Sequence, residues 1–191
     1  MKKIFCMALS AALLAVSMPA YAAEESLFTK TPHTFTAKVG TTEFTKDGEA
    51  QKLDVPIYIK DGYTMLPLRT FMKAALGEKS QMAWDNETKA ATVAFGGNLI
   101  RFSIKENTIA KNGKDLPVWG KMEVKDGRVF VPLRNWSGIL QSIGYLMEEG
   151  DITWDSTTKL ATVRAVEQKL DPSNGLEKPA LSGKGAQASY A

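Results

Sequence analysis

Five acidic side chains are the first candidates for chemistry, because paired carboxylates can hydrolyse glycosidic bonds. Asp85 and Asp155 each follow a tryptophan, and Glu148, Glu149 and Asp151 lie close together. A glycosidase uses two such groups, one as general acid and the other as base or nucleophile. Asp85 and Asp155, however, stand at the start of predicted turns, where a carboxylate commonly accepts local backbone hydrogen bonds. We expect a structural role for both, and a hydrolase is the weaker alternative.

Nucleophilic and metal-ligating side chains are scarce in this sequence. It holds one histidine, His33, and one cysteine, Cys6. A copper site usually needs several imidazoles, because neutral nitrogen donors suit that metal. We expect His33 to be a solvated loop residue. There is no nucleophile-elbow pattern and no glycine loop with a phosphate-binding lysine, and Gly96-Gly97 is interpreted as a turn. The sequence therefore predicts no catalytic residue, no metal site and no cofactor.

Two arginines, Arg69 and Arg134, could each grip a carboxylate or phosphate of a ligand. Both follow a Pro-Leu pair at the start of a predicted helix. Because an arginine recurs at this place, we favour an architectural role. In that interpretation each guanidinium bonds to strand carbonyls or to Asp85 and Asp155.

The four tryptophans divide into two groups. Trp84, Trp136 and Trp154 occupy apolar positions of the predicted elements, so we expect them to fill cores. Trp119 lies in a loop-like stretch, and the corresponding residue in the first half of the chain is Asp54. An aromatic residue present in one half only is a candidate for stacking on a sugar or contacting a protein. The alternative is that Trp119 plugs one face of the sheet.

These side chains belong to an internal repeat. Residues 61–69 recur as residues 126–134, an offset of 65 positions, and residues 84–93 recur as residues 154–163, an offset of 70. The second copy has therefore gained five residues, near 141–150. The repeated motif residues are Pro67, Leu68, Arg69, Trp84 and Asp85 in the first copy and Pro132, Leu133, Arg134, Trp154 and Asp155 in the second. Self-similarity of this kind predicts two copies of one module, at residues 34–97 and 98–166.

Each copy is predicted to contain strands, a short helix and further strands. Asp47-Gly48 and Asn112-Gly113 are hairpin turn signals. After Pro67 and Pro132 the apolar spacing changes from two to nearly four residues, which is typical of an amphipathic helix. Its apolar face is expected to hold Leu68, Phe71, Met72, Ala75 and Leu76 in the first copy, and Leu133, Trp136, Leu140 and Ile143 in the second.

The fold class follows from this order of elements. We predict an α+β fold, with a small antiparallel β-sheet curled around a short helix, repeated twice in tandem. The connection from Gly96 to Leu99 is too short for a free linker between independent domains. We therefore favour one body with a shared or closely apposed core.

The ends of the chain differ from its middle in composition. Residues 1–22 resemble a signal peptide, with two lysines, an apolar run and Ala20-Tyr21-Ala22 before the expected cleavage. The apolar run is shorter than the roughly 20 residues of a membrane span. Residues 23–33 are expected to form a loose lead-in, and residues 167–191 a disordered tail, because both are poor in apolar side chains.

Charge excludes one class of partner. Without the two lysines of the signal peptide the chain has 22 basic and 21 acidic residues. A nucleic-acid binder normally shows a concentrated basic stripe, and none is visible here. The lone cysteine lies in the signal peptide, so the mature protein is expected to have neither a disulfide nor a thiolate site.

The repeated Pro-Leu-Arg motifs, the helix after each of them and the Trp-Asp turns resemble the copper amine oxidase N-terminal-like domain, also called the stalk domain. The resemblance covers roughly residues 34–166. In the oxidases this domain is a non-catalytic appendage, so the resemblance implies a fold, an extracytoplasmic location and no enzymatic activity. We therefore expect a secreted, envelope-associated interaction or spacer module. A protein that binds cell-wall polysaccharide is the alternative, a wall hydrolase is the weaker one, and another envelope protein is a possible partner.

Overall fold

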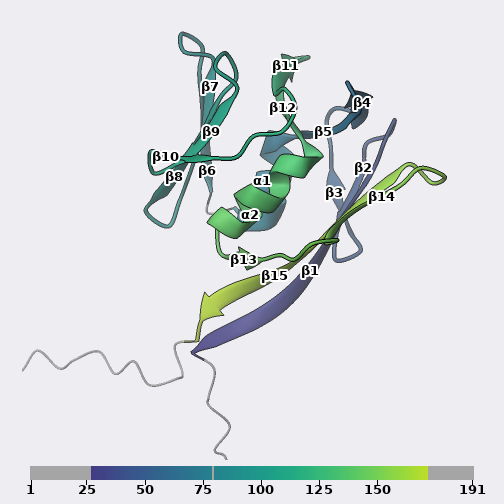
Figure 1. Cartoon of the computed structure of the whole chain (residues 1–191), viewed down its shortest axis with the longest axis vertical. Coiled ribbons are helices and arrows are strands. Elements are labelled where there is room, and N and C mark those ends of the chain that lie inside the picture. Colours follow the sequence, from purple (N-terminus) through teal and green to yellow (C-terminus); the bar gives the residue numbers. More distant parts are fainter. Residues whose placement is uncertain (1–26, 79, 172–191) are drawn as a thin grey trace, which may run out of the picture.

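The computed structural model describes residues 27–78 and 80–171, which form three antiparallel sheets around two short helices (Figure 1). The α+β class is thereby confirmed. The predicted signal peptide and most of the predicted tail lie outside the described residues. In the part that the structure describes, no helix has both the length and the apolar character needed to cross a membrane.

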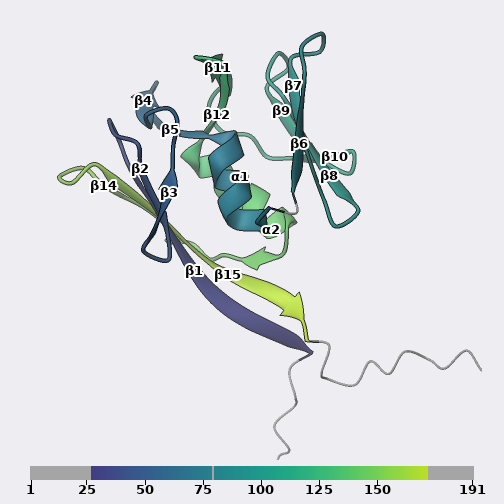
Figure 2. The same cartoon turned by 180° about the vertical axis from the view of Figure 1, so that it is seen from behind.

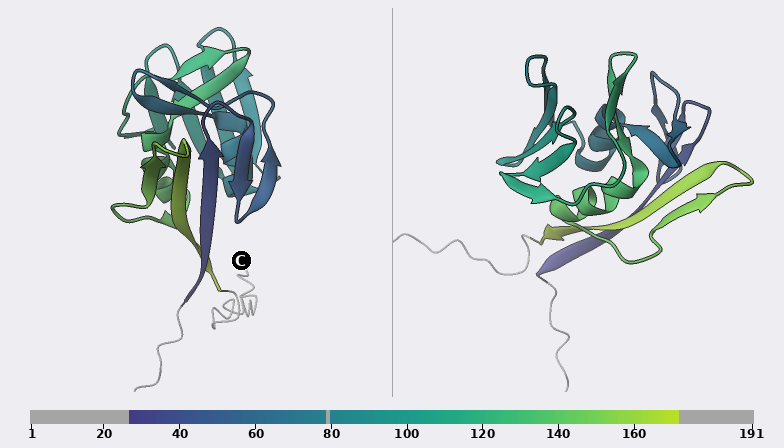
Figure 3. Two further views of the ribbon diagram at one scale, coloured as in Figure 1. Left: turned by 90° about the vertical axis from the view of Figure 1, so that its right-hand side faces the viewer. Right: turned by 45° about the horizontal axis from the view of Figure 1, so that its top comes forward.

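Two outer sheets lie on opposite sides of the helices. The third sheet, which we call the central sheet, lies between the two outer sheets (Figures 2 and 3). The first outer sheet has the order β13-β15-β1-β2-β3, with β14 also paired to β15. Its strands are β1 (Phe28–Lys38), β2 (Glu43–Lys46), β3 (Glu49–Lys52), β13 (Tyr145–Leu146), β14 (Ile152–Asp155) and β15 (Leu160–Leu170). The second outer sheet, β10-β9-β8-β7-β6, contains β6 (Gln81–Asp85), β7 (Ala90–Phe95), β8 (Asn98–Ser103), β9 (Thr108–Lys111) and β10 (Lys114–Leu116). The central sheet, β11-β12-β5-β4, contains β4 (Tyr58–Lys60), β5 (Tyr63–Pro67), β11 (Glu123–Lys125) and β12 (Arg128–Pro132).

Every sheet combines strands from both halves of the chain. The first outer sheet joins β1–β3 to β14 and β15, and the second joins β6 and β7 to β8–β10. In the central sheet β5 pairs with β12 so that Leu66 faces Val131, the residue 65 positions later. The expected arrangement of one sheet around one helix within each copy therefore does not describe these pairings. In each of the three sheets, a strand of the first half pairs with a strand of the second half.

The longest ladder joins the two ends of the described chain. β1 pairs with β15 over eleven residues, from Phe28 opposite Leu170 to Lys38 opposite Leu160. Residues 28–33 and 167–170, expected to be a loose lead-in and the start of a disordered tail, are thus strand. Neither segment has enough apolar residues to predict a strand alone, but each satisfies the backbone hydrogen bonds of the other.

The helical segment of each half begins directly after the predicted proline. α1 (Leu68–Leu76) follows Pro67, buries Leu68, Phe71, Met72 and Ala75, and ends at Gly77, whose φ of 73° suits glycine. In the second half a 3₁₀ turn, η1 (Leu133–Asn135), precedes α2 (Trp136–Ser142). Trp136 is completely buried, as expected.

One hydrophobic cluster fills the space between the sheets. It contains Phe35, Phe44 and Phe71 from the first half together with Phe102 and Trp136 from the second. Because a single cluster draws on both halves, the chain has a shared core. This agrees with the short connection between β7 and β8.

Candidate functional site

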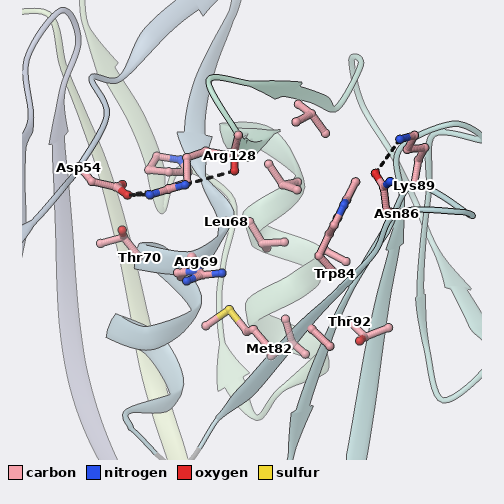
Figure 4. A pocket seen from close by; sticks show the side chains of 17 residues that line it. Asp54, Leu68, Arg69, Thr70, Met82, Trp84, Asn86, Lys89, Thr92 and Arg128 are labelled. Atoms are coloured by element: carbon pink, nitrogen blue, oxygen red, sulfur yellow. Dashed lines mark hydrogen bonds and ion pairs between the residues drawn. The ribbon is translucent and has the colours of Figure 1, made fainter.

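The first of two related grooves lies between α1, β6 and the β11–β12 hairpin, and we call it the Arg69 groove. It has a volume of about 430 Å³. Arg69 comes from the first turn of α1 and Trp84 from β6, on opposite sides of the space (Figure 4). Leu68 and Met82 supply apolar surface between them. The groove thus offers a cation and an aromatic ring over an apolar floor.

An ion pair closes one side of the Arg69 groove. Arg128, at the start of β12, donates a hydrogen bond to the carboxylate of Asp54 and forms an ion pair with it (Figure 4). The hydrogen bond from Arg128 holds the pKa of Asp54 below its usual value. Farther along, the Lys89 ammonium donates a 2.7 Å hydrogen bond to the side-chain oxygen of Asn86. The charged lining residues are three basic and one acidic: Arg69, Lys89, Arg128 and Asp54.

The second groove, which we call the Arg134 groove, is built from the equivalent elements of the other half. It lies between η1, α2, β14 and the β4–β5 turn, with a volume of about 680 Å³. Arg134 and Trp154 occupy the places of Arg69 and Trp84. The repeated motif therefore lines a groove in both halves of the molecule.

The two grooves differ at the positions that the repeat does not keep. Asp54 of the Arg69 groove corresponds to Trp119, 65 residues later, and Arg128 corresponds to Tyr63, 65 residues earlier. Trp119 and Tyr63 both line the Arg134 groove. The charge is also reversed. The charged residues of the Arg134 groove are Asp61, Glu148, Glu149 and Arg134, three acidic and one basic.

The loop that carries Trp119 is held by two asparagines. The side chain of Asn135 accepts a 2.7 Å hydrogen bond from the Trp119 backbone N–H and donates a 2.9 Å bond to its carbonyl. Asn107 does the same for the flanking residues, donating to the Gly120 carbonyl and accepting from the Met122 N–H, both at 2.9 Å. Asn135 is itself buried, with 1% of its surface exposed. The indole of Trp119 is thus presented by a fixed backbone while remaining 39% exposed.

Two tryptophans that were expected in the core are at the surface. Trp84 and Trp154 are each 41% exposed. They lie on β6 and β14, strands with a single neighbour in their sheets, and their rings line the grooves. The alternating pattern correctly predicted strands, but it could not tell which face of an edge strand packs on the core.

The expected bonds between the arginines and the repeated aspartates are not formed. Arg69 and Arg134 are both exposed. Asp85 instead accepts hydrogen bonds within its own turn, from the backbone N–H groups of Glu87 and Thr88 and from the Thr88 hydroxyl. These bonds, the one from the hydroxyl above all, lower the pKa of Asp85. The local role expected of this carboxylate is present, but the arginine is free to face the groove.

Asp155 makes the equivalent turn in the second half. It accepts hydrogen bonds from the N–H groups of Thr157 and Thr158 and from the Thr158 hydroxyl. As for Asp85, the hydroxyl is the main cause of a lowered pKa. Asp151 caps the insertion loop by accepting a 2.6 Å hydrogen bond from the Glu148 N–H. Glu148 and Glu149 line the Arg134 groove.

His33 is not the solvated loop residue that the sequence predicted. It lies on β1, its side chain is 11% exposed, and its Nδ1 is 2.6 Å from the carboxylate of Asp47. Its Nε2 is 3.4 Å from Glu167 on β15. Both ring nitrogens therefore face carboxylates, and this single histidine does not provide the set of imidazoles that a copper site of the oxidase type needs.

Sequence reasoning missed Tyr63 and Arg128 as groove residues, and it missed Asn135 as the residue that holds the Trp119 backbone. The sequence did contain a signal for Asn135. The equivalent residue in the first copy is Thr70, so the asparagine that holds Trp119 and Trp119 itself both occur in the second copy alone. Tyr63 and Arg128 also replace one another at the repeat offset. Paired differences between the two copies therefore pointed to the groove more directly than the shared residues did.

Comparison with known proteins supports the resemblance drawn from the repeated motifs. The family profile described as Copper amine oxidase N-terminal domain matches the chain twice, over residues 22–81 and residues 45–159. No curated protein and no solved structure matches significantly. The second profile match alone spans more than half of the 191 residues. The chain therefore belongs to the copper amine oxidase N-terminal domain family.

Proposed function

We propose that this protein is a secreted, non-catalytic interaction module of the cell envelope, and that it binds its partners in the Arg69 and Arg134 grooves. One observation carries the proposal: an arginine and a half-exposed tryptophan, repeated in the two halves, face a groove in each. A purely structural motif would bury these side chains, because an exposed tryptophan forgoes much of its packing energy. The module itself is inferred to be duplicated, with copies at residues 34–97 and 98–166.

The chemistry of the grooves suits binding. Guanidinium groups recognise carboxylates and hydroxyls through several N–H donors, and tryptophan supplies a large rigid surface at low entropic cost. The carboxylates that follow the repeated tryptophans in the sequence, Asp85 and Asp155, are engaged in their own turns. They are therefore committed to local structure, which favours a binding role over a hydrolytic one.

A carbohydrate-binding protein of the cell wall is the second candidate. Trp119 favours it, because a fixed and exposed indole in a groove of about 680 Å³ can stack on a sugar ring. An envelope protein is the alternative partner, and the export of the chain is inferred from residues 1–22.

Sedimentation with purified cell-wall material tests the proposal. The chain without residues 1–22 is incubated with the wall, and the pellet and the released sugar are both measured. Sedimentation that falls in Arg69→Ala/Trp84→Ala or in Arg134→Ala/Trp154→Ala supports binding through the grooves. Released reducing sugar would support hydrolysis instead. A protein that stays in solution with both wall material and envelope proteins would leave only a spacer role.

A further inference from the structure

We propose that the Arg134 groove binds a glycan chain whose sugars carry free amino groups, with one sugar ring stacked on Trp119. This inference rests on the proposed binding function and assigns a ligand class to one of its two grooves. The Arg69 groove has the opposite charge and no counterpart of Trp119, so it is not part of the assignment.

The first argument is the fixed position of Trp119. Four hydrogen bonds between the side chains of Asn107 and Asn135 and the backbone hold the segment from Trp119 to Met122, two donated and two accepted by the asparagines. Both polar atoms of the buried Asn135 amide bond to the Trp119 backbone, so the residue that presents the indole is anchored to the core. A stacking surface that is already ordered binds without a further loss of conformational entropy.

The second argument is the shape of the aromatic surface. The ring of Tyr63 lies against Gly120, so closely that a β-carbon at that position would come within 3.0 Å of the ring. Trp154, 41% exposed, lines the same groove from β14. The face of a pyranose ring presents C–H groups that pack on an aromatic face, while its hydroxyls remain at the edge for polar partners. Aromatic rings on two sides of an open groove suit a chain of such rings better than a compact ligand.

The third argument is charge. Asp61, Glu148 and Glu149 line the groove against the single cation Arg134. An ammonium group on the sugar pairs with these carboxylates, and it is also attracted to the faces of exposed tryptophans. Arg134 is left to donate hydrogen bonds to sugar hydroxyls. A neutral glycan offers these carboxylates hydroxyl hydrogen bonds but no opposite charge, and a polycationic peptide offers the charge but no sugar ring to stack on Trp119.

Calorimetric titration of the chain without residues 1–22 tests the assignment with three probes: the glucosamine hexamer, its fully N-acetylated form and hexalysine. At mildly acidic pH and low salt, we expect the glucosamine hexamer to bind at least about tenfold more tightly than either other probe. Trp119→Ala is expected to weaken this binding at least about tenfold. Glu148→Gln/Glu149→Gln, on an exposed loop, is expected to remove most of the preference over the acetylated hexamer. Leu99→Ala, a change at an exposed apolar residue of β8 that lines neither groove, is expected to have no effect.

The assignment is overturned if the glucosamine hexamer does not bind, if Trp119→Ala binds it unchanged, or if either other probe binds as tightly. The Glu148→Gln/Glu149→Gln variant keeps the test decisive should Trp119→Ala prove unstable by thermal melting. A failed titration together with wall sedimentation that still depends on Arg69 and Trp84 would reject the ligand and leave the proposed function standing. If the titration fails and wall sedimentation no longer depends on Arg69 and Trp84, both the ligand class and the proposed function are rejected.

Discussion

The rings of Phe71 and Trp136 lie with their centroids 3.9 Å apart, at the centre of the core. Phe71 belongs to α1 and Trp136 to the first turn of α2, and the two residues are 65 positions apart, the offset of the repeat. Equivalent residues of the two halves therefore touch each other. The same is true of Leu66 and Val131, which face each other in the central sheet.

Replacing Trp136 should be among the most damaging single changes. Trp136→Ala removes a fully buried ring at the contact between the halves, so we expect the free energy of unfolding to fall by about 3–5 kcal/mol. Among the described residues, the indole nitrogen of Trp136 is a buried donor without a partner. Trp136→Phe removes this unpaired group, so it should cost clearly less than alanine. Urea denaturation measures both, and a loss with phenylalanine as large as that with alanine would show that ring volume at this position does not stabilise the core.

Half of the molecule should not fold by itself. A fragment of residues 27–97 keeps β1–β7, but β1 loses β15, β5 loses β12 and β7 loses β8. We expect it to show no cooperative thermal transition by circular dichroism. A mixture with residues 98–171 should recover one. Cooperative melting of the first fragment alone would mean that the exchanged strands are dispensable.

Alanine at Arg69 or Arg134 should leave stability nearly unchanged. Because both side chains are exposed and neither bonds to the repeated aspartates, the expected change is within about 0.5 kcal/mol. This reverses the architectural role that the repeat itself suggested. A melting temperature that falls by many degrees in either variant would restore that role. Lysine at the same positions is the control for charge.

Acid should weaken the central sheet through Glu123. This carboxylate, on β11, accepts hydrogen bonds from Lys60 and Tyr58 on β4, and the bond from Lys60 is the main cause of its lowered pKa. A carboxylate whose pKa is lowered by folding stabilises the protein fully at a pH above its pKa in the unfolded chain. This contribution is lost as the pH falls through its pKa in the folded protein. Stability should therefore drop as the pH is lowered below the usual glutamate range.

The matched control for this effect is Glu123→Gln. The variant should be less stable than the wild type near neutral pH, and the difference should shrink as acid protonates the wild-type carboxylate. Denaturant midpoints measured across this range provide the check. A difference that stays constant with pH would assign the effect to geometry and not to charge.

Much of the fold could be predicted from the sequence because its local signals are strong. The Asp-Gly and Asn-Gly turns, the prolines before the helices and the apolar spacing of α1 all describe contacts within a few residues. The exchange of strands between the halves could not be predicted, because a repeat is equally compatible with two separate sheets. The pairing of residues 28–33 with residues 165–170 was missed for the same reason: a ladder between distant segments leaves no local pattern.

Of the candidate site, Trp119 was found from the sequence because it breaks the repeat. Trp84 and Trp154 were misassigned, since a strand with one neighbour has one covered and one open face, and alternation alone does not say which is which. Their position in the same grooves as Arg69 and Arg134 depends on the distance between the helical segments and the outer sheets. That distance is a property of the assembled core.

The eleven-residue ladder of β1 and β15 also fixes how the molecule responds to tension. Leu27 and Asp171 are joined by a 2.9 Å hydrogen bond at the outer end of this ladder. A force that draws these two residues apart acts across the strands and loads one pair of hydrogen bonds at a time, so that the ladder unzips from its end. Strands pulled along their length would share the load over every pair. The ladder therefore offers little resistance to tension applied at Leu27 and Asp171.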